Sequence, residues 1–139
     1  VLKLGSESLK SLKIRGRGVI VASEGIQIFS GISKESLGDL CILMSKSGIE
    51  IQTEAPIQAG LIAFSSDKKG YVKWNRKVKI FGNLLVDRLF TLNWPTDVGR
   101  PFENVLDYDP SFSSSDETHD IFAISIGPWV TFRRLTEGS

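Results

Sequence analysis

The chain has 139 residues, of which 17 are Lys or Arg and 16 are Asp or Glu, so its formal net charge is +1. This length predicts one domain with a core of its own, and the charge balance excludes a uniformly basic nucleic-acid-binding protein. A single cysteine, Cys41, and a single histidine, His119, exclude an internal disulfide, a multi-cysteine metal site and a pair of histidine ligands.

Residues 1–17 predict a short N-terminal cap. Leu4, Leu9 and Leu12, together with Lys10 and Lys13, come closer to a helical pattern than any other stretch of the chain. The chain begins at Val1 without a basic-then-apolar leader, and no apolar run reaches the roughly 18 residues that a transmembrane helix needs. We expect membrane anchoring only through a segment outside these residues.

Residues 18–92 contain an internal repeat. Each copy has a continuous apolar run, a short polar turn, a glycine and a triplet that alternates apolar and polar residues. The glycines are Gly25, Gly48 and Gly70, and a degenerate fourth copy begins at Gly82. The alternation and the β-branched residues predict strands, and each glycine is expected to provide a positive φ at a turn.

A third short apolar piece follows each triplet, so every copy provides about three short strands. Three strands and three corners make one turn of a β-solenoid, in which stacked coils bury a common core. The sequence therefore predicts an all-β, right-handed parallel β-helix of three to four coils, with Ile26, Ile49 and Tyr71 stacked on one wall. An antiparallel β-sandwich, whose strands recur every 8–12 residues, remains the alternative.

The apolar run of each copy is apolar on both of its faces, so its outer face should be covered. The cover is expected to come from the apolar segment 121–132 or from a partner chain. Residues 93–120 are rich in acids, Ser and Pro and are interpreted as a loop region. Residues 121–139 are interpreted as a C-terminal covering strand of the same single domain.

Few residues suggest chemistry. Trp74, beside Lys73 and Arg76, could stack on a sugar or bind a polyanion, or simply pack within the fold. Asp107 and Asp109 flank a tyrosine and could act as paired carboxylates, or lie in a turn. The acids around His119 lack the spacing of metal ligands. The sequence indicates no catalytic set, no metal site and no cofactor.

Several motifs carry a resemblance to a known family. They are Gly25-Ile-Gln-Ile28, Gly48-Ile-Glu-Ile51, Gly60-Leu-Ile-Ala63, Gly82-Asn-Leu-Leu-Val86 and Asp107-Tyr-Asp-Pro110. Residues 18–92 resemble β-helical segments of type IV pilus assembly-associated proteins of the PilX-like kind. The resemblance implies a structural role in the bacterial cell envelope or on the extracellular surface, and it implies no catalytic residues.

Two functions are consistent with these observations. The first is a non-enzymatic structural or protein-interaction module, which binds other protein subunits through apolar faces of the solenoid. The second is a β-helix that binds or cleaves an acidic polysaccharide through Lys73, Arg76, Asp107 and Asp109. A cleft that gathers these four side chains would favour the second function, and their scattering over different faces would favour the first.

Overall fold

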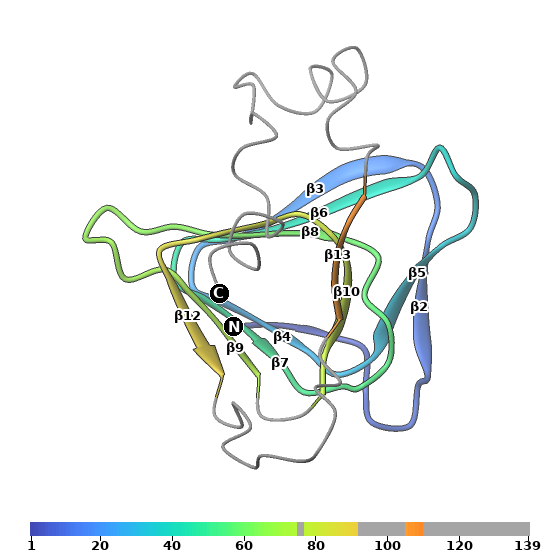
Figure 1. The fold of residues 1–139 in the computed structure, drawn as a ribbon, viewed down its shortest axis with the longest axis horizontal. Helices are drawn as coiled ribbons and strands as arrows, with labels where there is room; N and C mark the ends of the chain where they lie inside the picture. The colour runs from blue at the N-terminus through green and yellow to red at the C-terminus, as the bar shows by residue number, and fades with distance from the viewer. Residues whose placement is uncertain (75–76, 92–104, 110–139) are drawn as a thin grey trace.

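The computed structural model describes residues 1–74, 77–91 and 105–109, and every regular element among them is a β-strand (Figure 1). The strands are β1 (Leu2–Leu4), β2 (Ser11–Ile14), β3 (Arg17–Ala22), β4 (Gly25–Ile28), β5 (Gly31–Lys34), β6 (Leu40–Ser45), β7 (Gly48–Ile51), β8 (Gly60–Ala63), β9 (Tyr71–Trp74), β10 (Lys79–Gly82), β11 (Leu84–Val86), β12 (Arg88–Thr91) and β13 (Val105–Tyr108). The all-β prediction is confirmed.

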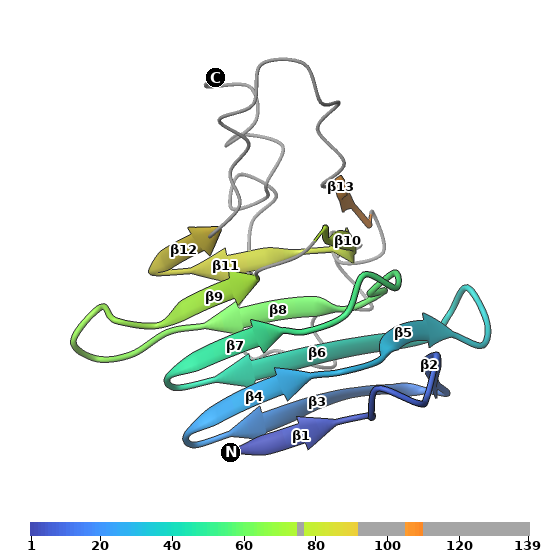
Figure 2. The same cartoon turned by 90° about the horizontal axis from the view of Figure 1, so that it is seen from below.

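The strands form three walls that enclose a triangular interior (Figure 1). The first wall has the order β1-β4-β7-β9-β12, and the third wall has the order β3-β6-β8-β11. The second wall contains β2, β5, β10 and β13, joined in the middle by single bridges from Ile57 to Ile32 and Ile80. Every described strand pairing is parallel, and the chain climbs as a right-handed β-solenoid of about four coils (Figure 2). The antiparallel sandwich is excluded.

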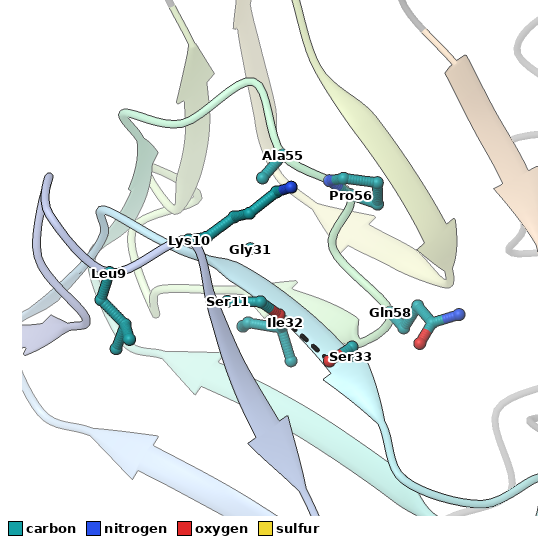
Figure 3. Close-up of a pocket in the computed structure, with 9 residues that line it drawn as sticks. All are labelled: Leu9, Lys10, Ser11, Gly31, Ile32, Ser33, Ala55, Pro56 and Gln58. Atoms are coloured by element: carbon teal, nitrogen blue, oxygen red, sulfur yellow. Dashed lines mark hydrogen bonds between the residues drawn. The ribbon is translucent and has the colours of Figure 1, made fainter.

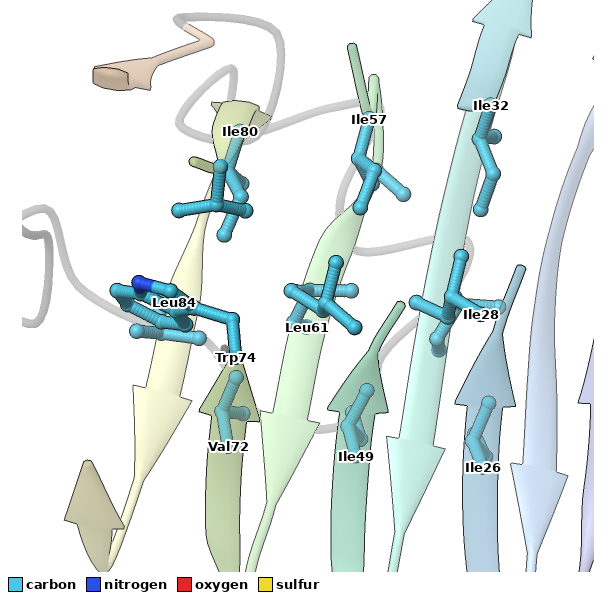
Figure 4. Close-up of a cluster of buried hydrophobic side chains, with 14 of the residues drawn as sticks. Ile26, Ile28, Ile32, Ile49, Ile57, Leu61, Val72, Trp74, Ile80 and Leu84 are labelled. Carbon is cyan, nitrogen blue, oxygen red and sulfur yellow. The ribbon is translucent and has the colours of Figure 1, made fainter. Parts of the chain in front are cut away.

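The core is a set of ladders in which residues of successive coils lie one above the next (Figure 4). On the first wall Ile26, Ile49 and Val72 are in register and at most 1% exposed. On the second wall Ile32, Ile57 and Ile80 form an equivalent ladder. Fully burying one such side chain contributes about 1.5–3 kcal/mol. The alternating triplets therefore direct their apolar residues inward, as period two requires.

One expected position in the first wall is wrong by a single residue. Val72, and not Tyr71, pairs with Ile49, while Tyr71 pairs with Gly48. The step of 23 residues that joins Ile26 to Ile49 continues to Val72. A shift of one residue moves a side chain to the opposite face of a sheet, so Tyr71 lies on the outer surface.

The repeated glycines serve close packing and not positive φ. Among the described residues, positive φ occurs only at Gly5, Gly16 and Lys68. A Cβ on Gly48 would lie 2.2 Å from Cζ of Tyr71, because the phenol ring rests on the glycine. The absence of a side chain at Gly48 therefore makes room for the aromatic ring of the next coil.

The N-terminal residues do not form the expected cap. Instead, β1 and β2 are two strands of a complete first coil, and they pair in register with β4 and β5. The expected loop region 93–120 contains a strand, because β13 pairs in parallel with β10. The remainder of that region, and the expected covering strand 121–139, lie outside the described residues.

The outer face of the third wall is covered in part, as its apolar character predicts. Leu40, Ile42 and Ile62 point outward there and are at most 4% exposed, and Tyr108 packs against this cluster. At the other end of the same face, Val21 and Phe64 are 58% and 43% exposed. Segment 121–132, one of the two expected covers, lies outside the described residues.

Candidate functional site

The structure separates the basic and aromatic candidates of the sequence. Lys73 and Trp74 are neighbours on β9, so they face opposite sides of the first wall. Trp74 is 3% exposed and packs in the core, whereas Lys73 lies on the outer surface. Trp74 is therefore a packing residue and cannot provide a stacking surface for a sugar. Arg76 lies outside the described residues.

The two acidic candidates have different surroundings. Asp107 is exposed on β13 of the second wall. Asp109 follows this strand and forms an ion pair with Lys34, a mostly buried lysine of β5. This pair attaches the end of β13 to the second coil, beside the place where Tyr108 covers the third wall. Asp109 therefore has a structural role, and the two carboxylates do not form a common site with Lys73 on the first wall.

Other chemical signals are weak within the described residues. No group of three or more His, Cys, Asp or Glu side chains there is placed to hold a metal ion. Cys41 is 3% exposed, and burial raises the pKa of its thiol, so it behaves as a small buried hydrophobic residue. His119 lies outside the described residues. This part of the chain also lacks a helix that could cross a membrane.

A shallow groove of about 490 Å³ lies on the second wall (Figure 3). It is lined by Leu9, Lys10, Ser11, Gly31, Ile32, Ser33, Ala55, Pro56 and Gln58. The hydroxyls of Ser11 and Ser33 bond to each other at 3.0 Å, and Lys10 is the one charged residue of the lining. The groove therefore offers no pair of acid and base for catalysis.

The most distinctive feature is the N-terminal edge of the described coils. Strands β1, β2 and β3 are the outermost strands of the three walls, and no described strand pairs with their outer edges (Figure 2). Their free backbone N–H and C=O groups form a template for a further strand. We call this surface, made of β1, β2 and β3, the open end.

Burial shows that the core continues to the open end. Ile20 of β3 points inward in register with Leu43, yet Ile20 is 36% exposed and Leu43 is fully buried. The same contrast separates Leu12 of β2, which is half-buried, from Ile32, which is 1% exposed. Leu2, Leu4 and Ile14 are likewise only half-buried. A further coil or strand would bury these side chains.

The first coil is firmly attached to the second coil, so the open end is a defined surface. At one corner, Asp39 accepts hydrogen bonds from the backbone N–H groups of Gly16 and Ser36, both at 2.7 Å. Nearby, Arg17 Nε donates to the carbonyl of Gly38 at 3.0 Å. Asp39 is 7% exposed, and its carboxylate thus bridges the two coils.

Acid is expected to loosen this corner through Asp39. The hydrogen bond from Gly16, and then that from Ser36, lower the pKa of Asp39 below its ordinary value of 3.8. Because the pKa of Asp39 is lower in the folded state than in the unfolded state, the ionised carboxylate contributes its full stabilisation of the fold at pH values above the unfolded-state pKa. This stabilisation is lost as the pH falls through the folded-state pKa. Asp39→Asn should be less stable than the wild type at neutral pH and should lose less stability on acidification.

Urea unfolding at a series of pH values down to about pH 2 measures this effect. The stability curves of the two proteins should converge in acid. Parallel curves would show that Asp39 does not contribute to the acid sensitivity of the fold. Asp67→Asn, in the exposed turn between β8 and β9, is a comparison variant, because the pKa of Asp67 is also lowered, mainly by Ser65. That turn does not join the first coil to the second.

The residues of the open end were not among the candidates predicted from the sequence, although a signal was present. Leu2-Lys3-Leu4 has the same alternation as Ile26-Gln27-Ile28, and it lies one coil length earlier in the chain. Extending the repeat by one copy towards the N-terminus would have identified β1. The exposure of the inward side chains, however, depends on which strands stack above and below them.

Comparisons with known proteins leave the family open. No family model matches the sequence, and no curated protein or solved structure matches it. The role and location that the PilX-like resemblance implies therefore stay proposals.

Proposed function

We propose that this chain is a non-enzymatic structural module that binds another protein subunit in an assembly of the bacterial envelope or cell surface. Binding occurs at the open end, where a strand of the partner pairs with an outer edge and covers the inward side chains. The observation that carries this proposal is the exposure of Ile20, 36%, beside the fully buried Leu43 one coil further along. The envelope location and the pilus-like role rest on the resemblance of residues 18–92 alone.

Strand addition suits this end for two physical reasons. Pairing satisfies backbone groups along the free edges of β1, β2 and β3, and it removes the apolar side chains of the first coil from water. The described candidates for polysaccharide chemistry do not share one site, and this also favours the structural module. Lys73 and Asp107 lie on different walls, Trp74 is in the core, and Asp109 is in an ion pair.

The proposal is tested with two matched substitutions on one edge strand. Ile20 and Val21 are adjacent on β3 and both are exposed, but Ile20 faces the interior and Val21 faces outward. An inward lysine on an edge strand blocks further strand pairing. Ile20→Lys should therefore abolish partner binding, whereas Val21→Lys, which adds the same charge to the same strand, should preserve it.

The measurement starts from wild-type protein immobilised for capture from a bacterial envelope extract. The captured subunit is purified, and its dissociation constant for the wild type and both variants is measured by calorimetry. Hydrogen exchange of the complex should show new protection of amides in β1, β2 or β3. Far-UV circular dichroism confirms that both variants fold, and the milder Ile20→Thr repeats the comparison.

Equal binding by wild type and Ile20→Lys would contradict the proposal, as would protection that appears only on other coils. Failure of the wild type to retain any subunit would also contradict it. Equal loss of binding in both variants would indicate that the partner contacts the outer face of the third wall and not the open end. The proposed mode of binding would then be wrong.

A further inference from the structure

The first coil is strongly basic, although the net charge of the whole chain is only +1. Residues 1–17 contain five basic side chains and one acidic side chain, all exposed. They are Lys3, Lys10, Lys13, Arg15, Arg17 and Glu7. The open end is therefore a basic rim around an apolar centre.

Contacts with the second coil neutralise only part of this rim. Arg15 Nε lies 3.6 Å from a carboxylate oxygen of Glu35, and the N-terminal amine lies 3.1 Å from Glu24. Lys3, Lys10 and Lys13 form no ion pair with the described residues. These three ammonium groups remain available for a partner.

The basic residues also have a regular position relative to the core. On β1, Lys3 faces outward between the inward Leu2 and Leu4. On β2, Lys13 faces outward between Leu12 and Ile14. A strand added to either edge would place its inward residues on the apolar centre and its outward residues beside a lysine. Opposite charges on directly facing residues stabilise strand pairing, and like charges destabilise it.

The same charges disfavour a second copy of this chain bound end to end through its open end. Such a symmetric contact would bring two identical basic rims together, ten basic side chains against two acidic ones by sequence. Like-charge juxtaposition across an interface is strongly unfavourable. The occupant that fits is a different subunit with the opposite charge.

We infer that the open end binds an acidic β-strand, a partner segment in which apolar residues alternate with Asp or Glu. The apolar residues cover Leu12, Ile20 and their neighbours, and the carboxylates pair with Lys3, Lys10 and Lys13. This inference rests on the proposed function and adds the chemistry of the partner. It predicts binding that weakens with salt, because rim charges exposed to solvent are screened.

The test uses the full chain and two labelled synthetic peptides of eight to ten residues, the length of an ordinary strand or slightly more. In one peptide Ile alternates with Glu, and in the other Ile alternates with Lys. Fluorescence anisotropy at low ionic strength should show that the acidic peptide binds about tenfold or more tightly than the basic one. This preference should diminish as the salt concentration is raised towards about 1 M.

Two triple variants locate the charges responsible. Lys3→Gln, Lys10→Gln and Lys13→Gln, combined in one chain, should reduce the preference for the acidic peptide several-fold. The control combines Lys46→Gln, Lys68→Gln and Lys79→Gln, which remove the same charge from exposed lysines of later coils. The control should keep the preference of the wild type.

The outcomes separate this inference from the proposed function. If both peptides bind the wild type equally and Ile20→Lys abolishes both, strand addition holds and the acidic partner is wrong. If neither peptide binds, both proposals fail for strands of this kind. If the control variant loses the preference as much as the first triple variant, the whole-chain charge and not the rim is responsible, and the inference is overturned. Binding of two copies, detected by sedimentation without peptide, would also overturn it.

Discussion

Replacing Ile49 with alanine is expected to lower the free energy of unfolding by about 2–5 kcal/mol. Ile49 is fully buried in the middle of a ladder, between Ile26 and Val72. Truncation leaves a cavity enclosed by the coils above and below, and parallel strands held by hydrogen bonds on both sides cannot collapse to fill it. Because a domain of this size is stable by only about 5–15 kcal/mol, this loss is a large fraction of the total.

Urea unfolding followed by far-UV circular dichroism measures the change, from the midpoint and slope of the transition. Lys73→Ala is the matched control, because Lys73 lies on the outer face of the same wall, next to Val72. That substitution should change the stability by no more than about 0.5 kcal/mol. Similar losses in the two variants would show that the interior of the first wall does not carry the stability of the fold.

Substituting Gly48 with alanine is expected to cost about 1–3 kcal/mol, because it overpacks the contact with Tyr71. The new Cβ would lie 2.2 Å from Cζ of the ring, and the ring would have to leave the backbone on which it rests. Moving it would also disturb its edge-to-face contact with Phe90, whose ring centroid is 5.9 Å away. The strain comes from this one side chain, so removing the ring should relieve it.

A double-mutant cycle with Tyr71→Ala tests this origin. In the Tyr71→Ala background, Gly48→Ala should cost little, which corresponds to a coupling energy of about 1–3 kcal/mol between the two sites. Gly18→Ala is the control glycine, because nothing lies within 4 Å of the Cβ that it would gain. Additive effects of the two substitutions would mean that Gly48 is required for another reason.

The solenoid could be predicted from the sequence because the main signal for it is local. Gly25-Ile-Gln-Ile28 and Gly48-Ile-Glu-Ile51 alternate at period two, and this alternation determines which side chains face the core. The repeated order of unlike segments, an apolar run, a glycine and an alternating triplet, then favoured stacked coils over the antiparallel sandwich, which remained the alternative. The prediction was wrong at the third copy, because it treats Gly70 as the equivalent of Gly48. The residue that pairs with Gly48, 23 positions later, is Tyr71, and Ile49 therefore pairs with Val72.

The functional candidates were harder to place from the sequence. Lys73 and Trp74 are adjacent in a basic segment, which suggested one surface, but alternation along β9 separates them into the exterior and the core. Asp109 appeared to pair with Asp107, whereas the fold brings Lys34 to it from 75 residues away. Contacts between distant coils decide such partners, and no short motif contains them.

The amino-acid sequence by itself determined that this chain forms short strands with apolar residues on alternate positions, repeated at a spacing that suits stacked coils. Only the tertiary structure decided which strands lie outermost among the described coils and which of their side chains are exposed. Ile20 and Leu43 belong to equivalent strands but differ in exposure. Described coils lie on both sides of Leu43 and on only one side of Ile20. Burial in a solenoid is a property of neighbours along the stack, and residues about 23 positions away supply those neighbours.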